Sequence, residues 1–77
     1  MDVEARITDI LVKSLHMEPD EITPEANLKT DLEMDSTELV ELVIGLEQEF
    51  KVSLRDGELS NKQSVGDIEK IISDKLG

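Results

Sequence analysis

Apolar residues recur with the spacing of an α-helix in three separate segments of this chain of 77 residues. One apolar face runs over about residues 2–16, a second over about 36–50 and a third over about 65–76. Val52-Ser53-Leu54 alternates like a strand, but no second segment is available to pair with it. The spacing therefore predicts an all-α fold in which three main helices form a small bundle.

The start of each predicted helix carries a residue that is suited to capping. Asp2 can cap the first helix, Asp35 or Ser36 the second, and Ser64 the third. Asp35 with Glu38 three positions later resembles a capping box. The second helix is apolar around more than half of its circumference, which predicts that it is the most buried of the three. Four of its side chains should face the core: Leu39, Val43, Leu46 and Phe50.

Two connecting segments also carry structural signals. Residues 17–35 form the longest stretch without periodicity, and loops of this length in small domains are usually functional or disordered. Three apolar side chains give this stretch anchors that should pack across the bundle: Ile22, Leu28 and Leu32. Residues 56–61, around Leu59, are predicted to form a short fourth helix.

The charge balance limits the classes of partner that the chain can bind. Eight Lys and Arg residues stand against 19 Asp and Glu residues, which gives a net charge of −11. This balance argues against binding to nucleic acid or to anionic lipid, because both need clustered cations. Leu, Ile, Val and Phe supply 24 of the 77 residues, well above the roughly 20% that is typical of disordered chains. We therefore expect residues 1–77 to fold as one domain, a monomer without disulfides.

Few residues are suited to intrinsic chemistry. The chain has no cysteine and a single histidine, His16, so a thiolate nucleophile, a His-based metal site and a Ser–His pair are not expected. No general base stands at a recognisable position near a hydroxyl, and a non-enzymatic protein is predicted. Residues 1–4 contain neither a basic region nor an apolar run, and no apolar stretch approaches the roughly 20 residues of a membrane span. The expected location is the cytoplasm.

The segment from Asp31 to Phe50 contains seven acidic residues and neither Lys nor Arg. Within it, Ser36 lies at the predicted start of the second helix, where free backbone N–H groups and the helix dipole favour an anion such as a phosphate ester. Flanking acids would repel that phosphate, so they are expected to serve another purpose. A surface of one sign steers an oppositely charged partner. The plainer interpretations are that Ser36 only caps the helix and that the acids form a solvated face.

The run Asp35-Ser36-x-x-x-Val40-x-Leu42, followed by Leu46 and Phe50, resembles the attachment segment of acyl carrier proteins. These are small acidic helical bundles that carry a 4′-phosphopantetheine arm on the serine of an Asp-Ser dipeptide. The resemblance extends over nearly the whole chain, including its length, the first helix, the long loop and the last helix. It implies an acyl-carrier-like fold and a function in which acyl intermediates travel as thioesters between enzymes.

The resemblance also implies roles for individual residues. Ser36 would bear the arm, made from coenzyme A by a phosphopantetheinyl transferase, and Asp35 would help to position that transferase and its metal. Acyl synthases, transferases and reductases would use basic patches of their own to dock on five residues of this chain: Thr37, Glu38, Glu41, Glu47 and Glu49. Three residues would line a groove for the acyl chain: Val40, Leu46 and Leu59.

Several positions depart from the common pattern of the family. Glu33 stands where a glycine is usual, and Thr37 stands where Leu or Met usually follows the serine. Lys62 replaces an apolar residue and Leu59 a residue that is often smaller, which argues against a deep cavity between the helices. Gly45 weakens the second helix by roughly 1 kcal/mol. These departures favour a specialised acyl or polyketide pathway over bulk fatty-acid synthesis.

Two other functions remain as alternatives. One is a carrier of aminoacyl or peptidyl groups that uses the same arm. The other is an acidic helical interaction module without a prosthetic group. The strongly acidic second helix favours an acyl carrier over an aminoacyl or peptidyl carrier, whereas a Ser36 that is never modified would indicate the interaction module.

Overall fold

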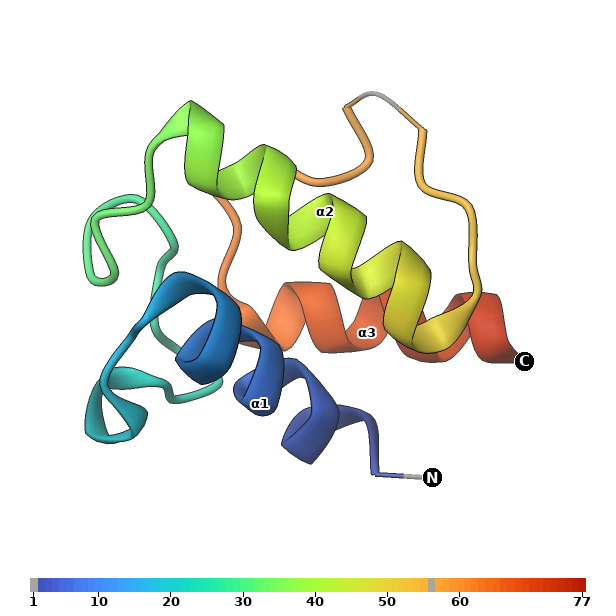
Figure 1. Ribbon diagram of the computed structural model, residues 1–77, viewed down its shortest axis with the longest axis horizontal. Coiled ribbons are helices and arrows are strands. Elements are labelled where there is room, and N and C mark those ends of the chain that lie inside the picture. The colour runs from blue at the N-terminus through green and yellow to red at the C-terminus, as the bar shows by residue number, and fades with distance from the viewer. Residues whose placement is uncertain (1, 56) are drawn as a thin grey trace.

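Three α-helices form the framework of the protein, as the computed structural model shows for residues 2–55 and 57–77 (Figure 1). Helix α1 spans Val3–Leu15, the short 3₁₀ helix η1 spans Pro19–Glu21, α2 spans Ser36–Phe50 and α3 spans Val65–Leu76. The described residues contain no strand and only an isolated bridge between Asn27 and Ser64. The all-α prediction is confirmed, and each main helix ends within one residue of its expected boundary.

The predicted caps explain why these boundaries were visible in the sequence. Asp2 accepts a hydrogen bond from the backbone N–H at the third position of α1. Asp35 and Glu38 form a reciprocal capping box at the start of α2, and Ser64 and Asp67 form another at the start of α3. Each cap satisfies backbone N–H groups that have no partner within the helix.

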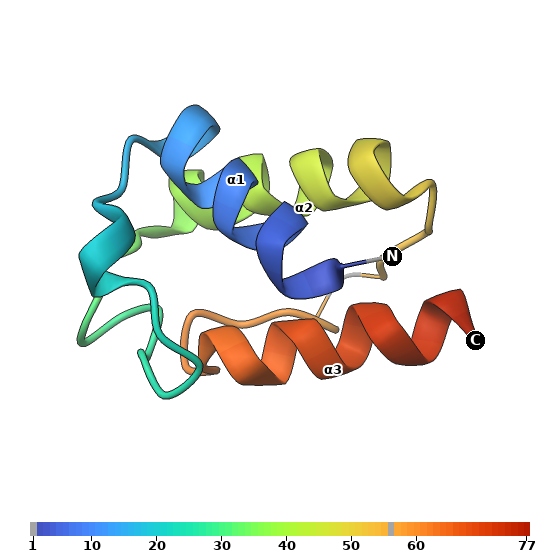
Figure 2. The same cartoon turned by 90° about the horizontal axis from the view of Figure 1, so that it is seen from below.

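Helix α1 packs against both other helices, whereas α2 and α3 make fewer direct contacts with each other than either makes with α1. Figure 2 shows α3 on the opposite side of the bundle from α2, with the segment after α2 passing from one side to the other. At the α1–α2 contact, a Cβ atom on Gly45 would lie 3.1 Å from Ile10 Cγ2. Gly45 therefore lets the two backbones approach closely, which offsets its low helix propensity.

Helix α2 is not the most buried helix, contrary to its apolar pattern. It buries Leu42, Leu46 and Phe50, but Val40 and Ile44 are 58% and 48% exposed. Leu39 and Val43, expected in the core, are only partly buried at its edge. The apolar face of α2 is wider than its neighbours can cover, because α1 packs on one side and no helix packs as closely on the other. An apolar strip on α2 is thus left open.

The long loop packs across the bundle as expected. Leu28 and Leu32 are buried and Ile22 is partly buried against the same core. Backbone hydrogen bonds tie this loop to the start of α3: Leu28 N–H donates to Gln63 O, Val65 N–H to Ala26 O and Gly66 N–H to Pro24 O. These bonds hold the middle of the loop against the start of α3.

The predicted short helix over residues 56–61 is wrong for the part that the structure describes, since residues 57–61 form turns; Asp56 lies outside the described residues. Gly57 has a φ of +88°, in the left-handed region, which an α-helix does not accept. Leu59 is nevertheless buried, so it anchors the turn through packing.

No helix in the described part of the chain is long and apolar enough to cross a membrane.

Candidate functional site

Ser36 is the first residue of α2 and its side chain is exposed. The capping position before it belongs to Asp35, whose Oδ1 accepts a 2.8 Å hydrogen bond from the backbone N–H of Glu38. Glu38 Oε1 in turn accepts a 3.2 Å bond from the backbone N–H of Asp35. Within the described residues nothing hydrogen-bonds the Ser36 hydroxyl, so the interpretation of Ser36 as the cap is wrong. Its hydroxyl faces solvent without a structural task.

The residues before Ser36 fix the direction from which the chain enters α2. Met34 is almost fully buried, and its backbone N–H donates a 2.8 Å hydrogen bond to Leu28 O. Glu33 has a φ of 52°, in the left-handed region that favours glycine. This conformation gives a physical reason for the glycine that is usual at this position in acyl carrier proteins. The turn and the buried Met34 together place Ser36 at the corner where the chain enters α2.

The helix N-terminus favours an anion at Ser36, whereas the negative charge of the neighbouring Asp35 opposes one. The N-terminus of a helix of 15 residues offers backbone N–H groups and a positive dipole end beside Ser36. The Asp35 carboxylate accepts a hydrogen bond from the N–H of Glu38 at the helix start, which partly offsets its charge. An exposed, unbonded hydroxyl at such a helix start therefore fits attachment of a phosphate ester.

In the described part of the chain no cluster of three or more side chains is arranged to hold a metal ion.

The first turns of α2 hold three of the predicted partner residues. Thr37 and Glu41 are exposed, and neither side chain forms a hydrogen bond or ion pair within the described residues. Glu38 is partly buried and belongs to the capping box. A partner can therefore reach Thr37 and Glu41 without breaking an internal contact, whereas Glu38 contributes first to the helix start.

The last turns of α2 hold the other two predicted partner residues, and both make contacts inside the protein. Glu47 Oε2 accepts a 2.9 Å hydrogen bond from the backbone N–H of Leu54, in a partly buried setting. Glu49 Oε2 lies 3.1 Å from the guanidinium of Arg6 on α1, in an exposed ion pair. Sequence reasoning missed both contacts, because the partners lie in other segments and no local pattern marks them.

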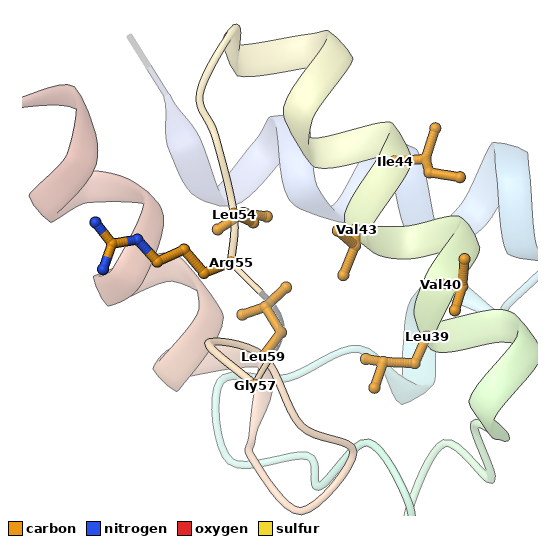
Figure 3. Close-up of a pocket in the computed structure, with 8 residues that line it drawn as sticks. All are labelled: Leu39, Val40, Val43, Ile44, Leu54, Arg55, Gly57 and Leu59. Atoms are coloured by element: carbon orange, nitrogen blue, oxygen red, sulfur yellow. The ribbon is translucent and has the colours of Figure 1, made fainter.

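An apolar pocket of about 240 Å³ lies beside α2, on the strip that α1 leaves uncovered. Its lining comes from α2 and from the segment that follows it: Leu39, Val40, Val43, Ile44, Leu54, Arg55, Gly57 and Leu59 (Figure 3). Val40 and Leu59 thus lie where a groove was expected, but Leu46 does not line it and is fully buried in the core. Leu59 forms a wall without filling the space, and the exposed Lys62 is not part of the lining. The expectation that these two residues argue against a deep cavity between the helices stays a prediction.

Figure 3 shows how the side chains of the pocket are arranged. Leu39 and Val43 point from α2 toward Leu59 on the facing segment. The side chain of Arg55 extends toward α3, away from α2, so its aliphatic stem and not its charge borders the space. The interior of the pocket is therefore apolar and suited to a hydrocarbon.

Polar contacts to α3 support the outer wall of the pocket. Glu58 Oε1 accepts a 2.9 Å hydrogen bond from the backbone N–H of Arg55, and the ammonium of Lys75 lies 2.9 Å from Glu58 Oε2. The bond from Arg55 and the nearby Lys75 lower the pKa of Glu58, because both favour the ionised carboxylate. An ionised Glu58 thus links the segment to α3.

In a comparison with known families, residues 5–72 match the family model described as "Phosphopantetheine attachment site". The matched range includes all of α2, the whole long loop and every residue that lines the pocket. It covers much more than half of the chain.

Proposed function

The chain belongs to the phosphopantetheine attachment site family, and we propose that it carries acyl groups on a 4′-phosphopantetheine arm attached to Ser36. Proteins of this family hold that group covalently, so the chain is a phosphopantetheine-carrying protein of the acyl carrier type. The group supplies a terminal thiol, which this cysteine-free chain lacks, and the thiol binds acyl groups as thioesters. We propose that residues 1–77 act as one carrier domain without catalysis of its own.

The state of the Ser36 hydroxyl is the observation that carries the assignment of the attachment site. It is exposed, no described residue hydrogen-bonds it, and it stands at the start of α2 because Asp35 does the capping. In the reaction, the Ser36 oxygen forms a bond to the phosphate of coenzyme A that bears pantetheine. Adenosine bisphosphate leaves, and the hydroxyl proton passes to a base of the phosphopantetheinyl transferase. Asp35 keeps the serine in place for this step.

The carrier family implies docking to that transferase and to the enzymes of a pathway. We propose that these enzymes approach the start of α2 with basic patches, guided by the exposed Glu41 and Thr37 beside Ser36. Exposed ion pairs contribute only about 0–1 kcal/mol each and are screened by salt. Such weak contacts suit a carrier that must leave each enzyme after one step.

The pocket supports an aliphatic acyl group as the cargo, as in fatty-acid synthesis or a specialised acyl or polyketide pathway. Its volume of about 240 Å³ exceeds the roughly 150 Å³ of an apolar cavity that accepts benzene. By that comparison it accepts a hydrocarbon segment of roughly six to ten carbons. An aminoacyl group is a poorer match, because its ammonium would lose water in an apolar space without a partner.

The proposal is tested by the intact mass of the protein after incubation with coenzyme A, magnesium and a broad-specificity phosphopantetheinyl transferase. We expect a gain of one phosphopantetheine on the wild type and on Thr30→Ala, and no gain on Ser36→Ala. Thr30→Ala is the matched control, because it removes another exposed hydroxyl, outside the proposed docking residues, and keeps Ser36. No gain on the wild type, under conditions that modify a control carrier, would overturn the proposal and favour an interaction module without a prosthetic group.

A further inference from the structure

The apolar side chains of the outer wall of the pocket are Leu54 and Leu59, which come from the irregular segment between α2 and α3. This segment has no helix of its own in its described residues, so no internal hydrogen-bond ladder sets the distance between the wall and α2. Helices α2 and α3 also pack less closely on each other than on α1. The width of the pocket therefore depends on how the segment is anchored to each helix.

On the side of α2 the anchor is Glu47. Its Oε2 accepts a 2.9 Å hydrogen bond from the backbone N–H of Leu54, seven residues later, and the contact is partly buried. A hydrogen bond to a charged acceptor in such a setting is stronger than one between neutral groups. Leu54 is at once the residue that Glu47 holds and a residue that lines the pocket.

On the side of α3 the anchor is Glu58, through the backbone N–H of Arg55 and the ammonium of Lys75. The segment is thus connected to both helices by carboxylates, and the two bonded N–H groups belong to the adjacent residues Leu54 and Arg55. The contact on the α2 side is the one that sets the distance from Leu54 to α2, where the inner wall of the pocket lies.

We propose that Glu47 is a positioning residue for the acyl pocket. Its carboxylate holds Leu54 in the outer wall and thereby sets which acyl chains the protein shelters. The expectation that Glu47 also docks partner enzymes stays a prediction. The role in acyl shelter rests on the proposed function, whereas the positioning of Leu54 concerns the chain alone and is testable without any acyl group.

The first test is amide hydrogen exchange measured by nuclear magnetic resonance on the wild type, Glu47→Ala, Glu47→Gln and Glu41→Ala. Exchange at Leu54 is compared with that of the core residue Leu46 in the same sample, which corrects for any change in global stability. We expect the Leu54 amide to exchange about tenfold faster relative to Leu46 in Glu47→Ala. Glu47→Gln, which keeps an acceptor oxygen, should restore most of the protection.

Glu41→Ala is the matched control, because it removes the same charge from the same helix at an exposed position without an internal contact. Its Leu54 amide should exchange at the wild-type rate. Wild-type protection of Leu54 in Glu47→Ala, or equal acceleration in Glu41→Ala, would overturn the proposal.

The second test compares melting temperatures of protein loaded with an octanoyl group and with an acetyl group. In the wild type the octanoyl form should melt at the higher temperature, because a longer chain fills the pocket. Glu47→Ala should lose most of that increment, while Glu41→Ala should keep it. An equal increment in Glu47→Ala and the wild type would refute the role of Glu47, whereas no increment in the wild type would instead refute the pocket as the acyl site.

Discussion

Asp35 caps α2, whereas no described residue hydrogen-bonds the Ser36 hydroxyl. This difference leads to a prediction about stability that does not depend on modification. Asp35 Oδ1 accepts the capping bond of 2.8 Å from the N–H of Glu38, and the N–H of Asp35 donates the return bond of 3.2 Å to Glu38 Oε1. Replacing Asp35 by Ala removes the capping carboxylate and leaves the N–H of Glu38 without its partner. Losses of such caps cost typically about 1 kcal/mol, and up to about 2 kcal/mol.

Replacing Ser36 by Ala should have almost no effect on stability. The hydroxyl is exposed and no described residue bonds it, and Ala has a slightly higher helix propensity than Ser. We expect a change between zero and a gain of about 0.5 kcal/mol in the free energy of unfolding. The Ser36→Ala variant would thus keep its fold while it loses the proposed attachment site.

The assay is urea unfolding of the unmodified proteins, followed by far-ultraviolet circular dichroism at fixed ionic strength. For a domain of this size, 1 kcal/mol corresponds to a shift in melting temperature of about 4–8 °C, so thermal unfolding gives an independent check. If Ser36→Ala loses as much stability as Asp35→Ala, the assignment of the cap is wrong. In that case Ser36 would stabilise the fold, and loss of modification in Ser36→Ala could result from unfolding as well as from loss of the attachment site.

Three further predictions concern charge and backbone strain. Glu69 has an Oε2 atom without a hydrogen-bond partner in the described residues, and burial, with the carboxylates of Glu4 and Asp2, raises its pKa. Ionised Glu69 therefore weakens the fold at neutral pH, and stability should recover as the pH falls through this raised pKa toward the ordinary value of 4.5. Glu69→Gln should add a few tenths of a kcal/mol, roughly 0.2–1 kcal/mol at most because solvent screens this carboxylate, at pH 7 and should remove that part of the pH dependence; urea unfolding at several pH values measures both, and no gain would contradict the account. Glu33→Gly should add about 0.5 kcal/mol, because relief of the left-handed strain exceeds the extra entropy of the unfolded glycine, and a loss in the same assay would contradict this reasoning. With a net charge of −11, the melting temperature should rise with salt, and melting that is flat across ionic strength would show that repulsion is not limiting.

The helices could be predicted from the sequence because their signals are local. Asp2, Asp35 and Ser64 each cap a helix through backbone N–H groups three residues away, and such signals can be recognised without tertiary structure. The sequence left open whether Asp35 or Ser36 caps α2, since both are good caps. Only the structure separates them.

The pocket could not be predicted in the same way. Periodicity gives the width of an apolar face, but not how many neighbours cover it. The exposure of Val40 and Ile44 could therefore not be predicted from the sequence. Leu54 lies in a segment without periodicity, and its place depends on Glu47, seven residues earlier. Glu58 depends on Lys75, 17 residues later. Contacts of this kind follow from the assembled bundle.

The central claim is that one particular hydroxyl bears the arm, and peptide mapping of the modified protein tests it most directly. Lys29 and Lys51 flank Ser36 with no Lys or Arg between them, so trypsin releases residues 30–51 as one peptide. Fragmentation of that peptide distinguishes its three hydroxyl residues, Thr30, Ser36 and Thr37. The account predicts one phosphopantetheine per chain, located on Ser36. A group found on Thr37, on Thr30 or on any other peptide would contradict it.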